Sequence, residues 1–210
     1  MDSPSPADTA APGTPPASRL SGVVADPRFG RLSADRQRVF AVAADPRLGQ
    51  LDKWAVDRTL TRLAPDPVAF TEQRHGIPPG ILSTMEQFES SGNPNAISKT
   101  GARGAFQITG PTGRAYGLPE DQWFDRLSQL STAGNILADN LKTAKGDIRG
   151  ALALYGDHKD PTYADRLLSR HAATTTGPTA SSSETRQPTS DTAGWTPQTP
   201  TPVRAFGQAT

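Results

Sequence analysis

The sequence predicts an all-α protein. Apolar residues recur at three- and four-residue spacing in several segments, which is typical of helices that bury one face. Aspartate, glycine and proline positions divide the chain into helix-sized pieces. No segment shows the two-residue alternation of a convincing strand, apart from a brief extended piece expected over 105–108.

Composition separates the two ends from the middle of the chain. Residues 1–18 and 172–210 are rich in Pro, Ala, Ser and Thr, and such segments cannot bury enough apolar surface to fold. We therefore expect two disordered tails. Trp195 and Phe206 are isolated aromatics in the second tail; they are either short docking points or scattered residues of a flexible segment.

Residues 19–69 are predicted to form a helical segment built on a short repeat. The run Asp26-Pro27-Arg28-Phe29-Gly30 recurs as Asp45-Pro46-Arg47-Leu48-Gly49, and Asp66-Pro67 marks the exit. Helices are expected over 34–44 and 53–63, with Ser33 and Asp52 as N-caps. Two such units make a small helical hairpin. The expected buried faces carry Val39, Phe40 and Ala43 in the first helix, and Trp54, Val56, Leu60 and Leu63 in the second.

Residues 70–171 are predicted to form the main helical domain. Asp147 is a good start signal for one of its helices. The chain of 210 residues has room for this one domain and its appendages. Apolar stripes indicate helices over 81–91, 121–130, 132–145, 147–155 and 161–170.

Glu89 is the most informative residue for function. An apolar stripe leads up to it along the helix over 81–91, and Gly92 and Pro94 then stop that helix. The carboxyl therefore lies in the last turn, near Met85. The partial negative charge of the helix end and the apolar neighbours both raise its pKa. A carboxylic acid kept protonated near neutral pH suits cleavage of a glycosidic bond. The alternative is a solvated surface glutamate.

The residues after Glu89 carry a family resemblance. Glu89-Ser90 leads into Asn93-Pro94-Asn95-Ala96, then Ser98-Lys99-Thr100-Gly101-Ala102-Arg103-Gly104, then Gln107. This order resembles the signature of the soluble lytic transglycosylase family, which is related in fold to goose-type lysozyme. The resemblance covers most of residues 76–170 and implies a lysozyme-like helical domain. It also implies that Glu89 acts alone, as acid and then base, on the β-1,4 bond between N-acetylmuramic acid and N-acetylglucosamine in peptidoglycan. The product is a 1,6-anhydro end, and no water is consumed.

The same resemblance assigns the residues that position the glycan. Ser90 is expected to orient the site through a hydrogen bond, and Ser98 to help position Glu89. Gln107 is expected in the saccharide groove, and Tyr155 and Tyr163 at the cleft and its closing helix. Each also has an ordinary structural explanation: a serine of a helix end or loop, a satisfied amide, or a ring packed in the core.

One part of the chain departs from the family pattern. Gly156 stands where the family usually has asparagine, and Asp157-His158-Lys159-Asp160 replaces the usual glycine-proline continuation. A sugar contact is therefore expected to be lost or supplied differently. His158 is one source of such a contact, and a surface-loop histidine is the alternative.

A hydrolase would need a second carboxylate to activate water or to act as nucleophile. Glu86 lies one turn before Glu89 on the same helix and is expected to be solvated. The absence of an obvious partner favours transglycosylation, because an attacking hydroxyl already on the substrate replaces that group by proximity. Caps and turns are the expected roles of the remaining aspartates near helix ends, Asp125, Asp147, Asp157 and Asp160.

Composition also narrows the cofactors and partners. The formal net charge of +1 gives no reason to expect nucleic acid, and no apolar run is long enough to span a membrane. There is no cysteine and the 3 histidines lack metal-ligand spacing, so no metal or organic cofactor is expected. The expected partner is the peptidoglycan glycan strand.

The biological setting is predicted from the N-terminal part. Its first residues lack the basic and apolar regions of a secretory signal. The Asp-Pro repeats resemble segments of large phage virion and tail-associated proteins, although a helical spacer of the enzyme explains them equally well. We expect a phage virion protein that acts in the host periplasm or cell wall, or else an enzyme of a secretion machine in the bacterial periplasm or envelope. The alternative functions are a muramidase hydrolase of the same fold and a non-catalytic glycan-binding virion module.

Overall fold

The computed structural model describes residues 16–156 and 160–175. The chain divides into two units, Met1–Gly177 and Pro178–Thr210, and all described residues belong to the first. The expected tails 1–18 and 172–210 lie outside the described residues, except for 16–18 and 172–175, which are helical.

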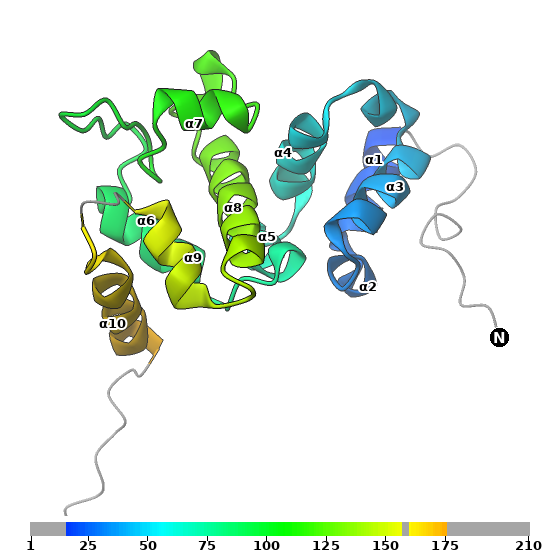
Figure 1. Cartoon of the computed structure of the whole chain (residues 1–210). Helices are drawn as coiled ribbons and strands as arrows, with labels where there is room; N and C mark the ends of the chain where they lie inside the picture. The colour runs from blue at the N-terminus through cyan, green and yellow to red at the C-terminus, as the bar shows by residue number, and fades with distance from the viewer. Residues whose placement is uncertain (1–15, 157–159, 176–210) are drawn as a thin grey trace, which may run out of the picture. The chain divides into compact units, whose positions relative to one another are not determined.

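The all-α prediction is confirmed for the described residues (Figure 1). They contain no strand; isolated bridges join Arg103 to Ile97 and to Ile108, close to the extended piece expected over 105–108. The helices are α1 Pro16–Ala25, α2 Pro27–Gly30, α3 Ala34–Ala44, the 3-10 helix η2 Pro46–Gln50, α4 Lys53–Leu63, α5 Pro67–His75, α6 Ile81–Ser90, α7 Gly110–Ala115, the 3-10 helix η3 Glu120–Gln122, α8 Arg126–Thr143, α9 Ile148–Tyr155 and α10 Tyr163–Thr175.

The Asp-Pro pairs are helix starts. The carboxylates of Asp26, Asp45 and Asp66 each accept a hydrogen bond from the backbone N–H two residues on, at 2.8, 3.2 and 3.1 Å. The proline that follows occupies the first helical position, where its missing N–H costs nothing. The third pair therefore begins α5, a helix that the sequence did not predict, rather than only an exit.

Local signals also place α3 and α4. Both helices have the predicted bounds. The Asp52 side chain caps α4 by accepting from the N–H of Ala55 at 2.8 Å, whereas Ser33 precedes α3 without a side-chain hydrogen bond. The cap predicted at Asp147 is likewise present at the start of α9.

The buried face predicted for α3 is wrong at two of its three residues, while Phe40 is partly buried against core residues. Val39 is 68% exposed and Ala43 is exposed, while Gln37, Ala41 and Ala44 are buried. Gln37 explains the rotation, because its amide donates to the carbonyl oxygens of Phe29 at 3.0 Å and Leu32 at 3.2 Å. A polar side chain thus occupies a position that the apolar pattern assigned to solvent.

The two helices predicted over 121–130 and 132–145 form one continuous helix, α8. After η3, α8 runs without a break from Arg126 to Thr143, and Asp125 caps it by accepting from the N–H of Ser128 at 2.7 Å. The polar Ser131-Thr132 pair does not interrupt the helix, because the Thr132 hydroxyl donates to the Ser128 carbonyl at 2.8 Å. At the other end of the chain, α10 continues past the predicted residue 170 to Thr175.

The helices bury two apolar clusters. Residues of α1 to α5 form one, and α8 lies along α4, α5 and α9 around the other (Figure 1). None of the helices in the described ranges has the length and apolar character that a bilayer-spanning segment requires. The second cluster comprises Ile77, Ile81, Leu82, Met85, Ala105, Phe106, Ile108, Leu118, Trp123, Leu130, Ala133, Ile136, Leu137, Ala151, Leu152, Tyr163, Ala164 and Leu167.

Helix α4 joins the N-terminal helices to the rest of the first unit. Arg58 donates to the carbonyl oxygen of Gly117 at 2.7 Å. The Trp54 ring packs against Tyr116 at 5.2 Å between centroids, and a Cβ on Gly117 would lie 2.6 Å from the Trp54 ring. This close approach requires glycine at 117.

Candidate active site

Helix α6 carries Glu89 in its last turn. The helix ends as predicted, because Ser91 and Gly92 both take left-handed backbone angles, with φ of 55° and 78°. Leu82 and Met85 on the same helix are fully buried. The buried face of α6 continues to Phe88, which packs partly buried against the same apolar residues, one position before Glu89.

Glu89 is half-buried and hydrogen-bonded. Burial raises the pKa of its carboxyl, and the hydrogen bond from the Tyr163 hydroxyl opposes part of that rise. The two oxygens are 2.5 Å apart, with Tyr163 donating to Oε1. The direction of the pKa shift is the predicted one.

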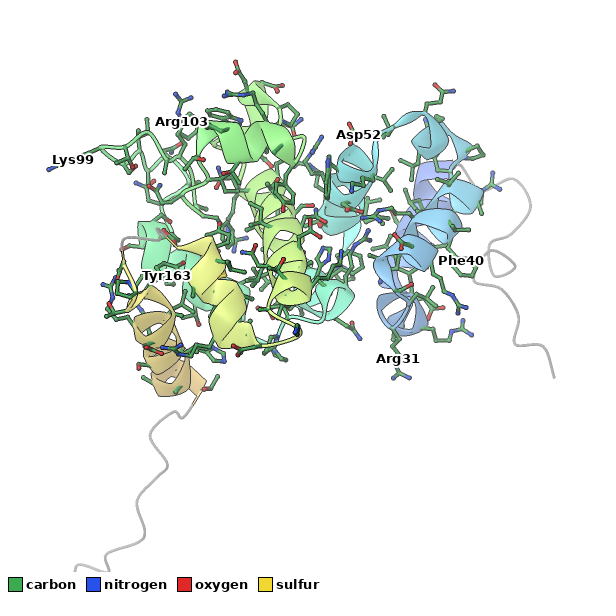
Figure 2. The ribbon with its side chains drawn as sticks, viewed as in Figure 1. Arg31, Phe40, Asp52, Lys99, Arg103 and Tyr163 are labelled. Carbon is green, nitrogen blue, oxygen red and sulfur yellow. The ribbon has the colours of Figure 1, made fainter. Side chains whose placement is uncertain are left out.

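Two tyrosines flank the carboxyl. Tyr163 lies at the start of α10, which packs against α6 and α9, and its ring meets Phe88 edge to face at 5.3 Å (Figure 2). The Tyr155 hydroxyl donates to the carbonyl oxygen of Phe106 at 2.9 Å. Burial, followed by the nearby charge of Glu89, raises the pKa of both tyrosines, so both hydroxyls keep their protons.

The Tyr163 ring explains why glycine stands at position 156, where the family usually has asparagine. A Cβ at this position would lie 2.6 Å from Cγ of the Tyr163 ring. An asparagine there would force the ring, which bonds to Glu89, out of its present position. Asp157, His158 and Lys159, which also belong to this departure, lie outside the described residues.

The loop between α6 and α7 supplies a wall of the site. Lys99 lies at its tip, extended away from the helices (Figure 2). Ser98 holds the loop closed: its N–H donates to the Ala102 carbonyl at 2.9 Å, and its Oγ accepts from the Ala102 N–H at 3.0 Å. The Gln107 amide nitrogen donates to the carbonyl oxygens of Gly104 at 2.9 Å and Ala96 at 3.3 Å, so the amide oxygen is the atom left for a ligand.

Gln129 organises the base of this loop, and the sequence did not predict it. It is buried on α8, accepts from the Phe106 N–H at 3.0 Å and donates to the carbonyl oxygens of Arg103 and Trp123. A Cβ at Gly104 would collide with its amide. Gln129 stands in the polar first turn of α8, beside Ser128, where the sequence gives no signal of burial.

A cavity of about 670 Å³ opens beside Glu89. This volume suits a small ligand or a few sugar atoms at a cleavage point. Five of the six predicted site residues line it, and the sixth, Ser90, does not. Its hydroxyl instead donates to the Ala105 carbonyl at 2.8 Å and so ties α6 to the loop. The lining comprises Phe88, Glu89, Ser98, Thr100, Ala102, Gln107, Thr109, Thr112, Leu154, Tyr155, Gly156, Asp160 and Tyr163.

The prediction that Glu86 is solvated is wrong. Glu86 is 5% exposed, and both its oxygens accept from Arg126 at 2.6 Å. It does not line the cavity. The partner lies on α8, forty residues away, so the local pattern held no signal for it.

Asp160 is a turn residue, as predicted, and it also lines the cavity. Its carboxylate accepts from the N–H of Thr162 at 3.0 Å and pairs with Arg166. The hydrogen bonds from Thr162 and the charge of Arg166 lower its pKa. The cavity therefore holds a carboxyl with a raised pKa, Glu89, and one with a lowered pKa.

Thr109, Thr112 and Leu154 line the cavity without having been predicted. Thr109 is the N-cap of the short helix α7, and its side chain also contacts Thr112. Leu154 is 39% exposed, an apolar residue left open on α9. In the part of the chain that the structure describes, no three His, Asp or Glu side chains gather as a metal site would require.

Comparison with known families agrees with this geometry. The family model described as "Transglycosylase SLT domain" matches residues 66–159, which span α5 to α9 and include Glu89 and Gln107. No curated protein and no solved structure matches the chain. The lysozyme-like helical fold implied by the resemblance is confirmed. Residues 66–159, somewhat less than half of the chain, form a transglycosylase SLT domain.

Proposed function

We propose that this protein is a peptidoglycan lytic transglycosylase. It cleaves the β-1,4 bond between N-acetylmuramic acid and N-acetylglucosamine and leaves a 1,6-anhydro end. The observation that carries the proposal is the half-buried acid: Glu89 has a raised pKa and lies in the wall of a cavity of about 670 Å³. A proton donor of this kind is what glycosidic cleavage requires.

The first step is proton donation. Because Tyr163 occupies Oε1 of Glu89, the acid proton resides on Oε2. Glu89 transfers this proton to the glycosidic oxygen, and the bond from that oxygen to the anomeric carbon breaks, with its electron pair leaving on oxygen. The Tyr163 hydrogen bond then stabilises the carboxylate that forms.

The second step closes the sugar. The Glu89 carboxylate takes the proton from the 6-hydroxyl of the muramyl residue while that oxygen bonds to the anomeric carbon. Glu89 ends the cycle protonated, and no water enters the product. Gln107 and Tyr155 line the same cavity and would hold the glycan for this intramolecular attack, whose advantage is proximity.

Product mass tests the proposal. Purified peptidoglycan digested with the protein is expected to release fragments one water lighter than hydrolysis products. Glu89→Gln should abolish release, while Glu120→Gln, at an exposed glutamate outside the cavity, should not. If both the wild type and Glu89→Gln bind peptidoglycan without cutting it, the protein is a non-catalytic glycan-binding module.

A hydrolase is the second candidate, because Asp160 lines the cavity with a lowered pKa. An ionised carboxylate there could activate water, as in inverting glycosidases. The variant Asp160→Asn distinguishes a hydrolase from a transglycosylase. A transglycosylase should keep its rate within a few-fold, whereas a hydrolase that uses this base should lose about 100-fold and yield products with a reducing end.

The biological setting is also a proposal. We infer that the protein opens a local hole in the cell wall for a phage virion or another envelope-spanning machine. The resemblance of the Asp-Pro repeats to virion-associated proteins supports this. The test is mass spectrometry of purified virions from a strain that carries the gene; absence of the protein from the particles would exclude the virion role.

A further inference from the structure

A second cavity, of about 590 Å³, lies between α3 and α4 on one side and α5 and α8 on the other. It shares no lining residue with the cavity beside Glu89. The cavity therefore lies where the SLT domain contacts helices that precede the matched segment. The lining comprises Ala34, Asp35, Arg38, Lys53, Trp54, Arg74, His75, Gly76, Asn135, Ala138, Asp139, Leu141, Lys142 and Gly146.

Arg74 lines this cavity with an unsatisfied donor. Its side chain is 1% exposed. One terminal nitrogen donates to Gln37 at 2.7 Å and the other pairs with Asp57, but the buried Nε has no hydrogen-bond partner among the described residues. A buried donor without an acceptor costs free energy, so native structures fill such positions with water or a ligand.

The His75 ring is a second group in this cavity that lacks a hydrogen-bond partner within the described residues. Burial and then the charges of Arg74, Arg38 and Lys142 together lower its pKa to about 3, against the opposing effect of Asp139. Its ring is therefore neutral at physiological pH, with one N–H to donate. No hydrogen bond to it is present within the described residues.

Cations outnumber carboxylates around these two donors. Arg74 pairs with the carboxylate of Asp57; Arg38 donates to the same carboxylate at 2.9 and 2.6 Å and also pairs with Asp35 at 2.7 Å. Lys142 pairs with Asp139 at 2.9 Å, and Asp35 is 93% exposed, so its charge is solvated. Lys53 lies over the Trp54 ring at 4.0 Å, at the mouth of the same cavity.

We propose that this cavity binds the oxyanion, carboxylate or phosphate, of a small ligand. The buried Nε of Arg74 and the N–H of His75 donate to the oxyanion, and Lys142 and Lys53 attract it from the rim. The Trp54 ring forms an apolar wall for the rest of the ligand. Charge-assisted hydrogen bonds of this kind are the strong ones in proteins.

Nuclear magnetic resonance of the full-length protein tests the proposal at His75. Its ring signals can be assigned with His75→Gln among only 3 histidines. Inorganic phosphate and glutarate are added separately, so that the two oxyanion types are distinguished, with chloride at matched ionic strength as the control. A bound oxyanion should shift the His75 signals saturably and raise the pKa of the ring, because negative charge favours the imidazolium.

Variants at the rim give the matched comparison. Lys142→Gln and Lys53→Gln should each weaken binding about fivefold, as expected for a partly exposed charge pair. Lys145→Gln removes a charge just beyond Lys142, at an exposed residue outside the lining, and should leave binding unchanged. Three results would overturn the proposal: no saturable shift with either oxyanion, an equal shift with chloride, or equal affinity in all three variants. Water would then be the partner of Arg74.

Discussion

The Tyr163 hydroxyl on α10 donates a hydrogen bond to Oε1 of Glu89 at the end of α6. Tyr163 follows the matched segment 66–159, whereas Glu89 lies inside it. The acid is therefore held by a helix that the family match does not include. Phe88 and Gly156 fix the position of the tyrosine, one by edge contact and the other by leaving room for the ring.

Tyr163→Phe should slow cleavage and move its pH dependence. The hydrogen bond favours the ionised carboxyl and lowers its pKa, so its loss raises the pKa of Glu89 further. The alkaline limb of the rate profile should move to higher pH, and kcat/KM should fall about tenfold, since a hydrogen bond to a charged group contributes roughly 1.5–3 kcal/mol. The measurement is a pH profile of peptidoglycan cleavage.

Tyr116→Phe is the control for that experiment. This tyrosine also bonds to a carboxylate, Asp139, but it does not line the active-site cavity. The pH profile of the Tyr116→Phe variant should match that of the wild type. A Tyr163→Phe profile that also superimposes on the wild type would show that the hydrogen bond does not tune Glu89.

Glu89→Gln should stabilise the fold at alkaline pH. Because the folded-state pKa of Glu89 is raised, the stability linked to its protonation is present at low pH and is lost as the pH rises through that pKa. The amide never ionises, so the variant should gain about 1 kcal/mol at pH 8 and nothing at pH 4. For a chain of this size that is a rise in Tm of roughly 2–4 °C. Equal Tm differences at both pH values would contradict the raised pKa.

Gly156→Asn restores the residue usual in the family and should impair this protein. The new Cβ would lie 2.6 Å from the Tyr163 ring, so the ring or the backbone at 156 must shift, which disturbs the hydrogen bond to Glu89. We expect activity to fall at least tenfold, about the worth of the Tyr163 contact, together with a lower Tm. Gly22→Asn introduces the same side chain at a glycine where a Cβ would have no atom within 4 Å, and it should leave activity unchanged.

Arg126→Gln should destabilise the fold by about 2 kcal/mol, because it leaves the buried Glu86 carboxylate without its partner. Thermal unfolding should show a Tm lower by roughly 4–8 °C. Arg149→Gln breaks an exposed pair with Asp165 and should cost less than about 1 kcal/mol. Adding Glu86→Gln to Arg126→Gln should recover stability, and a double variant no better than the single one would argue against the pair.

Much of the local structure was predictable from the sequence. The bounds of α3 and α4, the end of α6 and the caps Asp52 and Asp147 all follow from signals within a few consecutive residues. The position of Glu89 at a helix end, next to a recognisable family motif, also follows from such short-range signals. These features needed no knowledge of distant parts of the chain.

Other features were decided by tertiary structure alone. The buried face of α3 depends on carbonyl groups at the end of α2, and the burial of Glu86 depends on Arg126. Asp160 reaches the Glu89 cavity only because α10 folds back against α6. The sequence by itself determined the bounds of α3 and α4 and the place of Glu89 at the end of α6, because these are short-range properties. Only the folded chain decided which polar groups share a site, because burial and pairing join residues that are far apart in sequence.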